Sequence, residues 1–350
     1  MPTKMMKAAV LFRVNQPLKV VEIPIPRLQE GQVLVKVAAS GICHTQLLEM
    51  EGTHPTGDHT PNLLGHEGAG IVLDVGSGVN KVKKGDHVIL SWIKGSGKNV
   101  LPKGYEYDGK LLNAGFVTTF NDHAIVSENR VTTITKEMPF KEAALLGCAV
   151  ATGAGMVFNN TKIRSGQSIA VIGCGGIGIS AIQAAAISGA NPIIAVDLSD
   201  EKLEFVKKFG ATHTLNSSKV DAKNEIDKIT NGEGLDFAIE AVGNKSTMEL
   251  AYNSVKKFGG KAILCGVPKP GLKIEIDPFP LYYKRQLVGT GGGETNPDVD
   301  FKKYCDMYLQ GKLKLKEMIT HTISLDEINK GFQLMKDGRC CRVVIDFKEK

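Results

Sequence analysis

The sequence lacks the features that mark secreted proteins. Charge interrupts the N-terminal stretch MPTKMMKAAVLFRVNQ before any apolar run reaches the length of a secretory signal. The seven cysteines are an odd, scattered set and do not show the dense spacing of a disulfide scaffold. We therefore expect a cytoplasmic protein whose cysteines are thiols or thiolate ligands.

Other absences narrow the class further. The 350 residues contain no polar low-complexity tract and no internal repeat, and a content of 42% hydrophobic and 23% charged residues is typical of a folded chain with room for two domains. The net charge of +6 comes from lysines spread through acidic sequence, without a basic stripe interleaved with aromatic residues. We expect no nucleic-acid partner.

One uncharged run, between Arg164 and Asp197, has the length of a membrane span but not its regularity. The β-branched run SIAVIG leads into GCGGIG, which cannot continue as a regular helix or strand. ISAIQAAAISG then has helical apolar spacing, and NPIIAVD is a second apolar strand. Apolar strands flanking a helix are typical of a parallel sheet covered on both faces, so we expect no membrane partner.

The organisation of the whole chain follows from this alternation of strands and helices. It continues downstream and predicts a doubly wound, Rossmann-type α/β domain over residues 151–292. Residues 1–150 contain short alternating strands separated by Gly, Pro and Asn turns, which indicate a compact, mostly antiparallel β domain. Residues 293–350 hold helices and a closing strand, RVVIDF, without a sheet of their own. We expect them to fold back onto the first domain.

A glycine motif of the form G-x-G-x-x-G lies at the turn between the first strand and helix of the α/β domain. Its glycines are Gly173, Gly175, Gly176 and Gly178. They allow a tight turn and the close approach of a pyrophosphate to N–H groups at the helix N-terminus. The alternative is a turn that serves only helix–sheet packing.

An acidic residue follows the motif at the spacing expected for a ribose contact. Asp197 ends the next strand, about 20 residues after Gly178, where a carboxylate accepts a hydrogen bond from a 2′-hydroxyl and repels a 2′-phosphate. No arginine follows that would favour the phosphate, and Lys202 is the nearest base, a candidate ribose contact. The pattern predicts NAD rather than NADP as the cofactor.

Three residues that suit a metal stand far apart in the sequence. Cys43 lies in GICHT, His66 in GHEGAG and Cys148 in GCAVATG. Each has an ordinary alternative, because a buried cysteine is a common small hydrophobe and a histidine in a turn is often a satisfied core group.

Together with the glycine motif, these segments resemble the zinc-dependent alcohol dehydrogenases of the medium-chain dehydrogenase/reductase superfamily. The segment GHEGAGIVLDVGSGV is similar to the family's zinc signature, and ITHTISLDEINKGFQLMKDGRCCRVVIDF to a landmark near its end, so the resemblance covers essentially the whole chain. It implies a GroES-like fold for the first domain.

The resemblance implies that Cys43, His66 and Cys148 bind one catalytic zinc, with Glu67 beside the ion but not bound to it. Two thiolates and one imidazole suit Zn²⁺ and leave a fourth position open for water or substrate. Cysteine at position 148, where polyol dehydrogenases of the superfamily tend to have glutamate, favours the alcohol dehydrogenase branch.

The same resemblance implies roles for five further residues, and four of them have a structural alternative. Thr45 is expected to pass the proton away from the bound alcohol, or else to stabilise a turn. His44 and Arg342 are expected at the pyrophosphate, or else in water and in a surface ion pair. Thr152 is expected to touch the nicotinamide. Trp92 is expected to line the substrate pocket, or else to be core.

Three departures from the family pattern stand out. Leu48 replaces a histidine that finishes the proton relay in many relatives, and His54 or His59 could substitute for it. Gln46 replaces an aspartate that supports the zinc-bound histidine, and its amide oxygen is expected to accept from the imidazole N–H. The segment SWIKGSGKNVLPKGYEYDGKLLNAGF has none of the four cysteines of a structural zinc. We therefore predict one zinc per chain and expect packing or a neighbouring subunit to hold that segment.

We predict a zinc- and NAD-dependent oxidoreductase. It is expected to interconvert a primary alcohol and its aldehyde, or an alcohol and its ketone. A homo-oligomer, dimer or tetramer, is expected from the resemblance. A medium-chain dehydrogenase acting on a polyol, an amino alcohol or a glutathione-adducted aldehyde is the first alternative. A non-catalytic NAD-binding protein is the second, although such a protein has no need of an open metal site.

Overall fold

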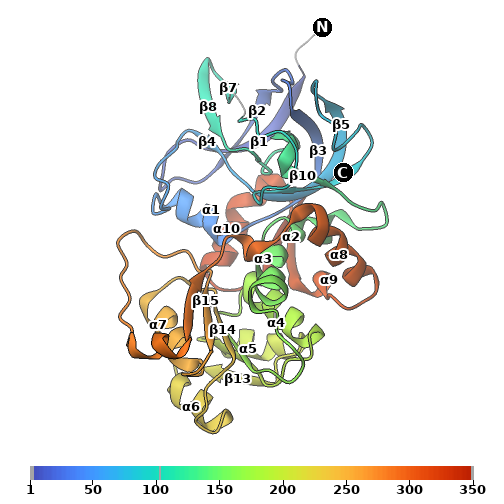
Figure 1. Ribbon diagram of the computed structural model, residues 1–350. Coiled ribbons are helices and arrows are strands. Elements are labelled where there is room, and N and C mark those ends of the chain that lie inside the picture. Colours follow the sequence, from blue (N-terminus) through green and yellow to red (C-terminus); the bar gives the residue numbers. More distant parts are fainter. Residues whose placement is uncertain (1–3, 102–103, 348–350) are drawn as a thin grey trace. The chain divides into compact units, whose positions relative to one another are not determined.

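The computed structural model describes residues 4–101 and 104–347 and divides into two compact units (Figure 1). The first unit runs to Cys148 and resumes at Asn296, and the second is Ala149–Thr295. The domain boundaries expected from the sequence stay a prediction.

The first unit is built mainly from strands. They are β1 (Met5–Leu11), β2 (Lys19–Pro24), β3 (Gln32–Gly41), β4 (Asn62–Leu63), β5 (Glu67–Val75), β6 (His87–Ser91), β7 (Tyr105–Tyr107), β8 (Lys110–Ala114), β9 (His123–Ser127), β10 (Val131–Thr133), β17 (Ile319–Ile323) and β18 (Arg342–Asp346). Its helices are α1 (His44–Met50), α2 (Phe140–Leu146), α8 (Pro297–Leu309), α9 (Leu315–Met318) and α10 (Ile328–Lys336), with short 3₁₀ turns at Glu128–Arg130 and Leu325–Glu327.

These strands form two sheets, ordered β2-β1-β4-β8-β7 and β10-β6-β5-β3-β18-β17, with β9 also paired to β3. Pairing is antiparallel except for β4 with β8 and β17 with β18. The C-terminal strand β18 pairs with β3 so that Val344 lies opposite Gly41. The tail therefore extends the sheet that contains β3.

Apolar side chains from distant segments form the core beneath this pairing. Leu47 on α1 packs in one cluster with Ile328 and Phe332 on α10 and with Leu11 on β1. The hydrophobic residues on α10 recur at helical spacing, so one face of the helix is buried and the other is exposed. This apolar core holds α1, the helix that follows Cys43.

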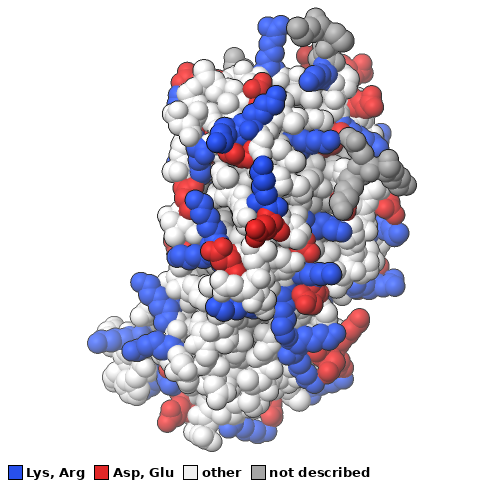
Figure 2. All heavy atoms as spheres, turned by 90° about the vertical axis from the view of Figure 1, so that its right-hand side faces the viewer, with Lys and Arg blue, Asp and Glu red and all other residues white. Residues whose placement is uncertain are grey.

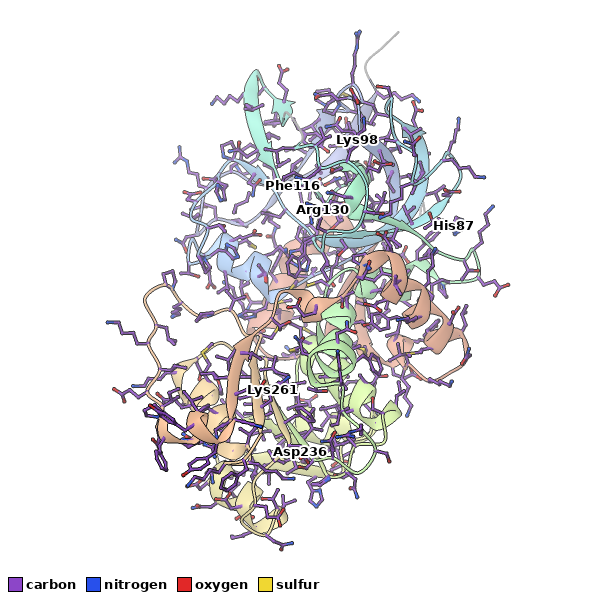
Figure 3. The ribbon with its side chains drawn as sticks, viewed as in Figure 1. His87, Lys98, Phe116, Arg130, Asp236 and Lys261 are labelled. Carbon is purple, nitrogen blue, oxygen red and sulfur yellow. The ribbon has the colours of Figure 1, made fainter. Side chains whose placement is uncertain are left out.

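The carboxylate of Glu128 binds backbone N–H groups near the start of residues 91–116, the segment that lacks the four family cysteines. Glu128 is 3% exposed. Its Oε1 accepts from the N–H groups of Asn80 and Lys81 at 2.6 and 2.9 Å, and its Oε2 accepts from the N–H of Lys98 at 2.8 Å. Lys98 is labelled in Figure 3. A carboxylate thus organises the beginning of this segment.

The second unit is a six-stranded parallel sheet flanked by helices. Its strands are β11 (Ile169–Ile172), β12 (Ile193–Asp197), β13 (His213–Asn216), β14 (Phe237–Glu240), β15 (Lys261–Leu264) and β16 (Gln286–Gly289), in the order β13-β12-β11-β14-β15-β16. Its helices are α3 (Ala149–Gly155), a π-helical turn (Met156–Thr161), α4 (Gly176–Ile187), α5 (Asp200–Lys207), α6 (Ala222–Ile229) and α7 (Lys245–Ser254), with 3₁₀ turns at Phe279–Tyr283 and Gly292–Glu294. The strand order reverses between β11 and β14, which is where open α/β sheets bind ligands.

Three further observations concern whole-chain properties. Among the described residues, which include all seven cysteines, no disulfide is present. No single helix there is long and apolar enough to cross a membrane, and one bent pair, Phe140–Leu146 with Ala149–Thr161, meets the criteria by length and composition alone. On the face drawn in Figure 2, basic and acidic side chains are interspersed.

Candidate active site

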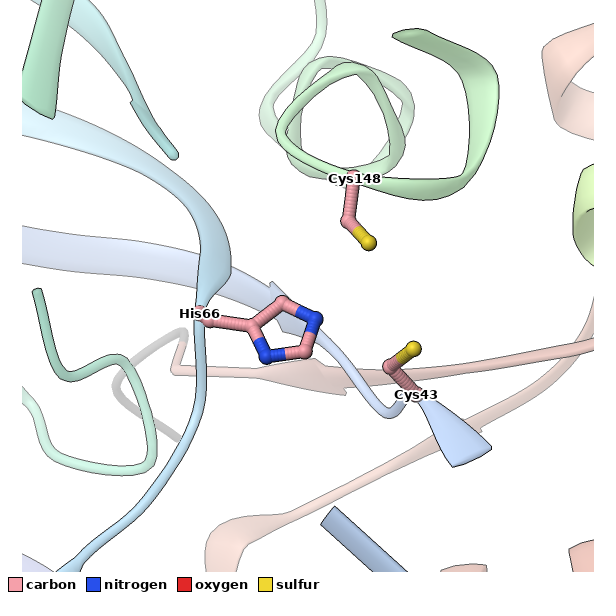
Figure 4. Close-up of side chains that lie close together, drawn as sticks. All are labelled: Cys43, His66 and Cys148. Carbon is pink, nitrogen blue, oxygen red and sulfur yellow. The ribbon is translucent and has the colours of Figure 1, made fainter. Parts of the chain in front are cut away.

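Three element ends of the first unit bring Cys43, His66 and Cys148 together (Figure 4). Cys43 caps the N-terminus of α1 directly after β3. His66 precedes β5, and Cys148 follows α2. Their ligand atoms all lie within 4.8 Å of one another, and within the described part of the chain this is the one such group of three or more His, Cys, Asp or Glu side chains.

The donor set fits a zinc ion. Two sulfur ligands at about 2.3 Å from a tetrahedral Zn²⁺ are roughly 3.8 Å apart, which is compatible with the observed cluster. The Nε2 atom of His66 is buried and has no hydrogen-bond partner in the structure. A buried polar nitrogen without a partner is costly, and a metal would satisfy it.

Electrostatics favour the thiolate form of Cys43. The hydrogen bond with Cys148, together with His66 and Arg342, holds the pKa of the Cys43 thiol well below its usual range, although burial acts in the opposite direction. Thiolates are the form of cysteine that binds zinc.

A buried ion pair lies beside the cluster. Glu67 is fully buried, and its carboxylate pairs with the guanidinium of Arg342, which is 5% exposed. The structure therefore places Glu67 next to the cluster and outside it. Arg342 engages a protein carboxylate rather than making the surface ion pair we considered, and its contact with a pyrophosphate stays a prediction.

Gln46 contacts the cluster in the opposite orientation to the one expected. Its amide oxygen accepts from the Cys43 N–H at 3.1 Å, and its amide nitrogen forms a close contact with Nδ1 of His66. The backbone N–H of Cys43 can only donate, and it therefore attracts the amide oxygen. A metal bound through Nε2 leaves the ring proton on Nδ1, so Gln46 would then have to turn its oxygen toward the ring.

Helix α1 places the predicted relay residues in different surroundings. The hydroxyl oxygen of Thr45 lies 3.7 Å from Cys43 Sγ, His44 is exposed, and Leu48 is half-buried. In the loop that follows, His54 Nδ1 lies 2.7 Å from the hydroxyl of Thr56.

Sequence reasoning missed one titratable side chain on this helix. Glu49 is half-buried and four residues after Thr45, so both lie on one face of α1. Burial raises the pKa of Glu49, and Cys43 adds to this while His66 and His59 oppose it. The i, i+4 spacing from Thr45 is the signal that could have identified it.

Trp92 follows β6 and is 39% exposed, which is inconsistent with the core alternative. Its indole N–H donates to Cys148 Sγ at 3.2 Å. The sequence indicated an aromatic near the zinc but not this bond.

In the second unit, the glycine motif connects β11 to α4 as predicted. A Cβ on Gly178 would lie 1.8 Å from the carbonyl oxygen of Gly173, so only glycine allows this approach of helix to strand. Gly175 is the N-cap of α4, and Gly176 is its first residue.

Asp197 binds the glycine turn and the turn that follows β12. Its carboxylate accepts from the N–H groups of Cys174 at 2.8 Å, Leu198 at 2.8 Å and Ser199 at 3.1 Å. A carboxylate offers about four acceptor positions, so one remains for a ribose hydroxyl. Lys202 lies in the first turn of α5, half-buried.

Thr152 lies in α3 and is 3% exposed, and its hydroxyl has no hydrogen-bond partner in the structure. A buried hydroxyl without a partner is consistent with a ligand contact.

Comparison with known proteins identifies the family. Residues 29–136 match the alcohol dehydrogenase GroES-like domain, and residues 176–309 match the zinc-binding dehydrogenase domain. The alcohol dehydrogenase class-3 of Cereibacter sphaeroides is 35% identical over 97% of this chain and 99% of its own length. The chain belongs to the zinc-binding alcohol dehydrogenase family. The S-(hydroxymethyl)glutathione dehydrogenase of Synechocystis sp. is also 35% identical, with the same coverage.

A solved structure agrees with this assignment. Benzyl alcohol dehydrogenase from Acinetobacter calcoaceticus superposes with a TM-score of 0.90 at 30% identity, covering 99% of this chain and all of that one. The predicted fold class, a Rossmann-type domain with a GroES-like domain, is confirmed. So is the predicted enzyme class, a zinc alcohol dehydrogenase with NAD as cofactor and a small alcohol or aldehyde as substrate.

Proposed function

We propose that this alcohol dehydrogenase interconverts a primary alcohol and its aldehyde, or an alcohol and a ketone, at the Cys43–His66–Cys148 cluster. The observation that carries the proposal is the convergence of two thiols and one imidazole, from three distant segments, to within 4.8 Å. Three ligands of this kind leave one coordination position for the substrate oxygen.

Each side chain of the cluster region has a distinct task in the proposal. Cys43, His66 and Cys148 would hold the ion, and zinc supplies Lewis acidity to an alcohol or carbonyl oxygen while NAD exchanges the hydride. The hydroxyl of Thr45, at the edge of the cluster, accepts the alcohol proton and passes its own onward. Glu67 pairs with Arg342 and holds that guanidinium, whose positive charge favours the thiolate of Cys43.

The onward path of the proton cannot use Leu48, which has no acceptor. His54 and His59 are the candidates predicted from the sequence. Glu49 is a third, supported by its position one turn after Thr45 on the same helix face. An acceptor on that face would connect the half-buried Thr45 hydroxyl to water.

We assign the cofactor to the glycine turn of the second unit. Gly173, Gly175, Gly176 and Gly178 accommodate the pyrophosphate. Asp197 accepts from the ribose 2′-hydroxyl, disfavours a 2′-phosphate and so selects NAD, with Lys202 nearby. Thr152 contacts the nicotinamide, and His44 and Arg342 the pyrophosphate. The buried Thr152 hydroxyl without a partner supports its contact with the nicotinamide, and the remaining acceptor position on Asp197 supports the ribose contact.

A glutathione-adducted aldehyde, as its alcohol form S-(hydroxymethyl)glutathione, is the second candidate substrate. It is favoured by the 35% identity to the Synechocystis enzyme named for that activity. Benzyl alcohol is the matching candidate from the structural comparison.

The test is NADH formation across a panel of benzyl alcohol, linear primary alcohols, secondary alcohols and S-(hydroxymethyl)glutathione. We expect turnover of primary alcohols, with NADP much poorer than NAD. Enzyme that contains zinc and binds NAD yet turns over nothing in the panel would favour the non-catalytic alternative.

We further propose one zinc per chain, a cytoplasmic location, and assembly as a homodimer or homotetramer. One zinc per chain is supported by the single cluster among the described residues. The cytoplasmic location is supported by the odd, scattered cysteines, and the oligomer by the family resemblance. Metal analysis would test the zinc content, and sedimentation would test the oligomeric state.

A further inference from the structure

The one tryptophan of the chain lies against the metal cluster. The Nε1–H group of Trp92 donates to Cys148 Sγ at 3.2 Å, and its ring meets the His66 ring edge-on, with centroids 6.5 Å apart. The indole thus touches two of the three ligand side chains.

Hydrogen bonds fix the backbone of Trp92 on both sides. Its N–H donates to the carbonyl oxygen of His66 at 3.1 Å, and its carbonyl oxygen accepts from the guanidinium of Arg130. The guanidinium carbon of Arg130 lies over the Phe116 ring, 5.0 Å from its centroid (Figure 3). The indole is therefore presented from a constrained position.

The cysteine is held relative to the same strand. Ser91, directly before Trp92, donates its hydroxyl to the carbonyl oxygen of Gly147, directly before Cys148, at 2.6 Å. Trp92 and Cys148, which form the N–H···S bond, are thus each preceded by a residue of the Ser91–Gly147 hydrogen bond. The backbones that carry the two side chains are therefore held relative to each other.

The chemistry of the two groups gives the bond a direction. An indole N–H can only donate, and sulfur accepts weakly as a thiol but more strongly as a thiolate. A donor on a thiolate withdraws electron density from it and restricts its orientation. Partners of this kind tune bound metals, and their removal typically weakens metal binding by roughly 10- to 100-fold.

We propose that Trp92 is a positioning residue of the metal site, whose indole N–H orients the Cys148 thiolate and reduces the charge it gives to the metal. This inference rests on the proposed function, because it requires Cys148 to be a ligand. It also gives Trp92 a role beyond that of a pocket wall.

Two replacements separate the N–H from the shape of the ring. Trp92→Phe keeps an aromatic side chain and removes the donor. Because the chain has one tryptophan, replacing that residue by its benzothiophene analogue changes a single position and exchanges N–H for sulfur with little change of shape. Zinc affinity is measured by competition with a chromophoric chelator, and thiolate character by the thiolate-to-Co²⁺ charge-transfer band of the cobalt-substituted enzyme.

We expect both replacements to weaken zinc binding about tenfold, because the Cys148 thiolate loses the donor that orients it and stabilises its deprotonated form. The charge-transfer band should move to lower energy, because a thiolate without its donor gives up an electron more readily. Tyr107→Phe, which removes a polar hydrogen from another aromatic side chain of the same unit, is the control and keeps wild-type values.

The outcomes distinguish this inference from the proposed function. Wild-type affinity and band energy in both replacements would overturn the role of Trp92 alone. A change in Trp92→Phe but not in the benzothiophene analogue would assign the effect to ring shape and also overturn it. A wild-type enzyme without any thiolate-to-cobalt band would overturn the ligand assignment as well.

Discussion

Replacing Glu128 by glutamine tests what holds residues 91–116 without the four family cysteines. The carboxylate accepts three backbone N–H groups, two at Oε1 and one at Oε2. Glutamine can keep its oxygen toward Asn80 and Lys81, but its NH₂ then faces the N–H of Lys98, a donor against a donor. One lost bond and two weakened ones come to about 3 kcal/mol, since hydrogen bonds to charged groups contribute roughly 1.5–3 kcal/mol and neutral ones about 1 kcal/mol.

Urea unfolding followed by Trp92 fluorescence measures this loss close to the affected segment. At a slope of about 2–3 kcal/mol per molar for a unit of this size, the midpoint should fall by about 1 M. Glu30→Gln is the matched control, because Glu30 is an exposed carboxylate paired with the side chain of the same Lys98. An unchanged midpoint in Glu128→Gln would refute the role of the carboxylate in this segment.

The pH dependence provides a second check on Glu128. Burial alone would raise the pKa of Glu128, but the N–H groups of Lys98, Asn80 and Lys81, with the charge of Lys81, outweigh it and lower the pKa. A lowered pKa in the folded state means that the stabilisation is present above the unfolded value, about 4.3, and is lost as pH falls through the folded value. The difference between wild type and Glu128→Gln should therefore shrink in acid, and a constant difference would contradict the mechanism.

The remaining predictions concern the two cofactor sites. Cys43→Ser should remove bound zinc and turnover while leaving NAD binding, measured by titration, nearly unchanged; retained activity would overturn the ligand assignment. Asp197→Ala should raise the Michaelis constant for NAD more than that for NADP, and unchanged selectivity would count against the ribose contact. Gln46→Asp should bind zinc about tenfold more tightly in chelator competition, because a carboxylate accepts from the Nδ1–H of His66 better than an amide does. Equal or weaker binding in that variant would show that the Cys43 N–H contact of Gln46 matters more.

The secondary structure was predictable where one local pattern decides it. The strand expected at NPIIAVD contains β12 (Ile193–Asp197), and the glycine motif lies at the predicted strand-to-helix turn. The hairpin of β7 and β8 was missed although it carries a signal. Asp108 and Gly109 both have positive φ, 50° and 68°, as expected for a two-residue Asp-Gly turn between strands.

The partners of individual polar groups were not predictable, because they depend on tertiary placement. The sequence shows a carboxylate at Glu128 but not the three N–H groups, from two other segments, that bind it. It shows an amide at Gln46, yet the orientation of that amide is decided by the N–H of Cys43. The resemblance could name the three side chains that converge because the family pattern records which residues meet.

Two glycines beside the cluster cysteines show how local sequence and tertiary contacts are related. A Cβ on Gly147, directly before Cys148, would lie 2.4 Å from the carbonyl oxygen of Leu90. A Cβ on Gly41, two residues before Cys43, would lie 2.5 Å from Oε1 of Glu67. Gly147 therefore admits a close approach of backbone to backbone before Cys148, and Gly41 leaves room for the Glu67 carboxylate before Cys43. The sequence shows the glycines at which the chain can be approached closely, and only the folded chain shows which atoms approach them. The Cys43–His66–Cys148 cluster therefore depends on Gly41 and Gly147 as well as on its own three side chains.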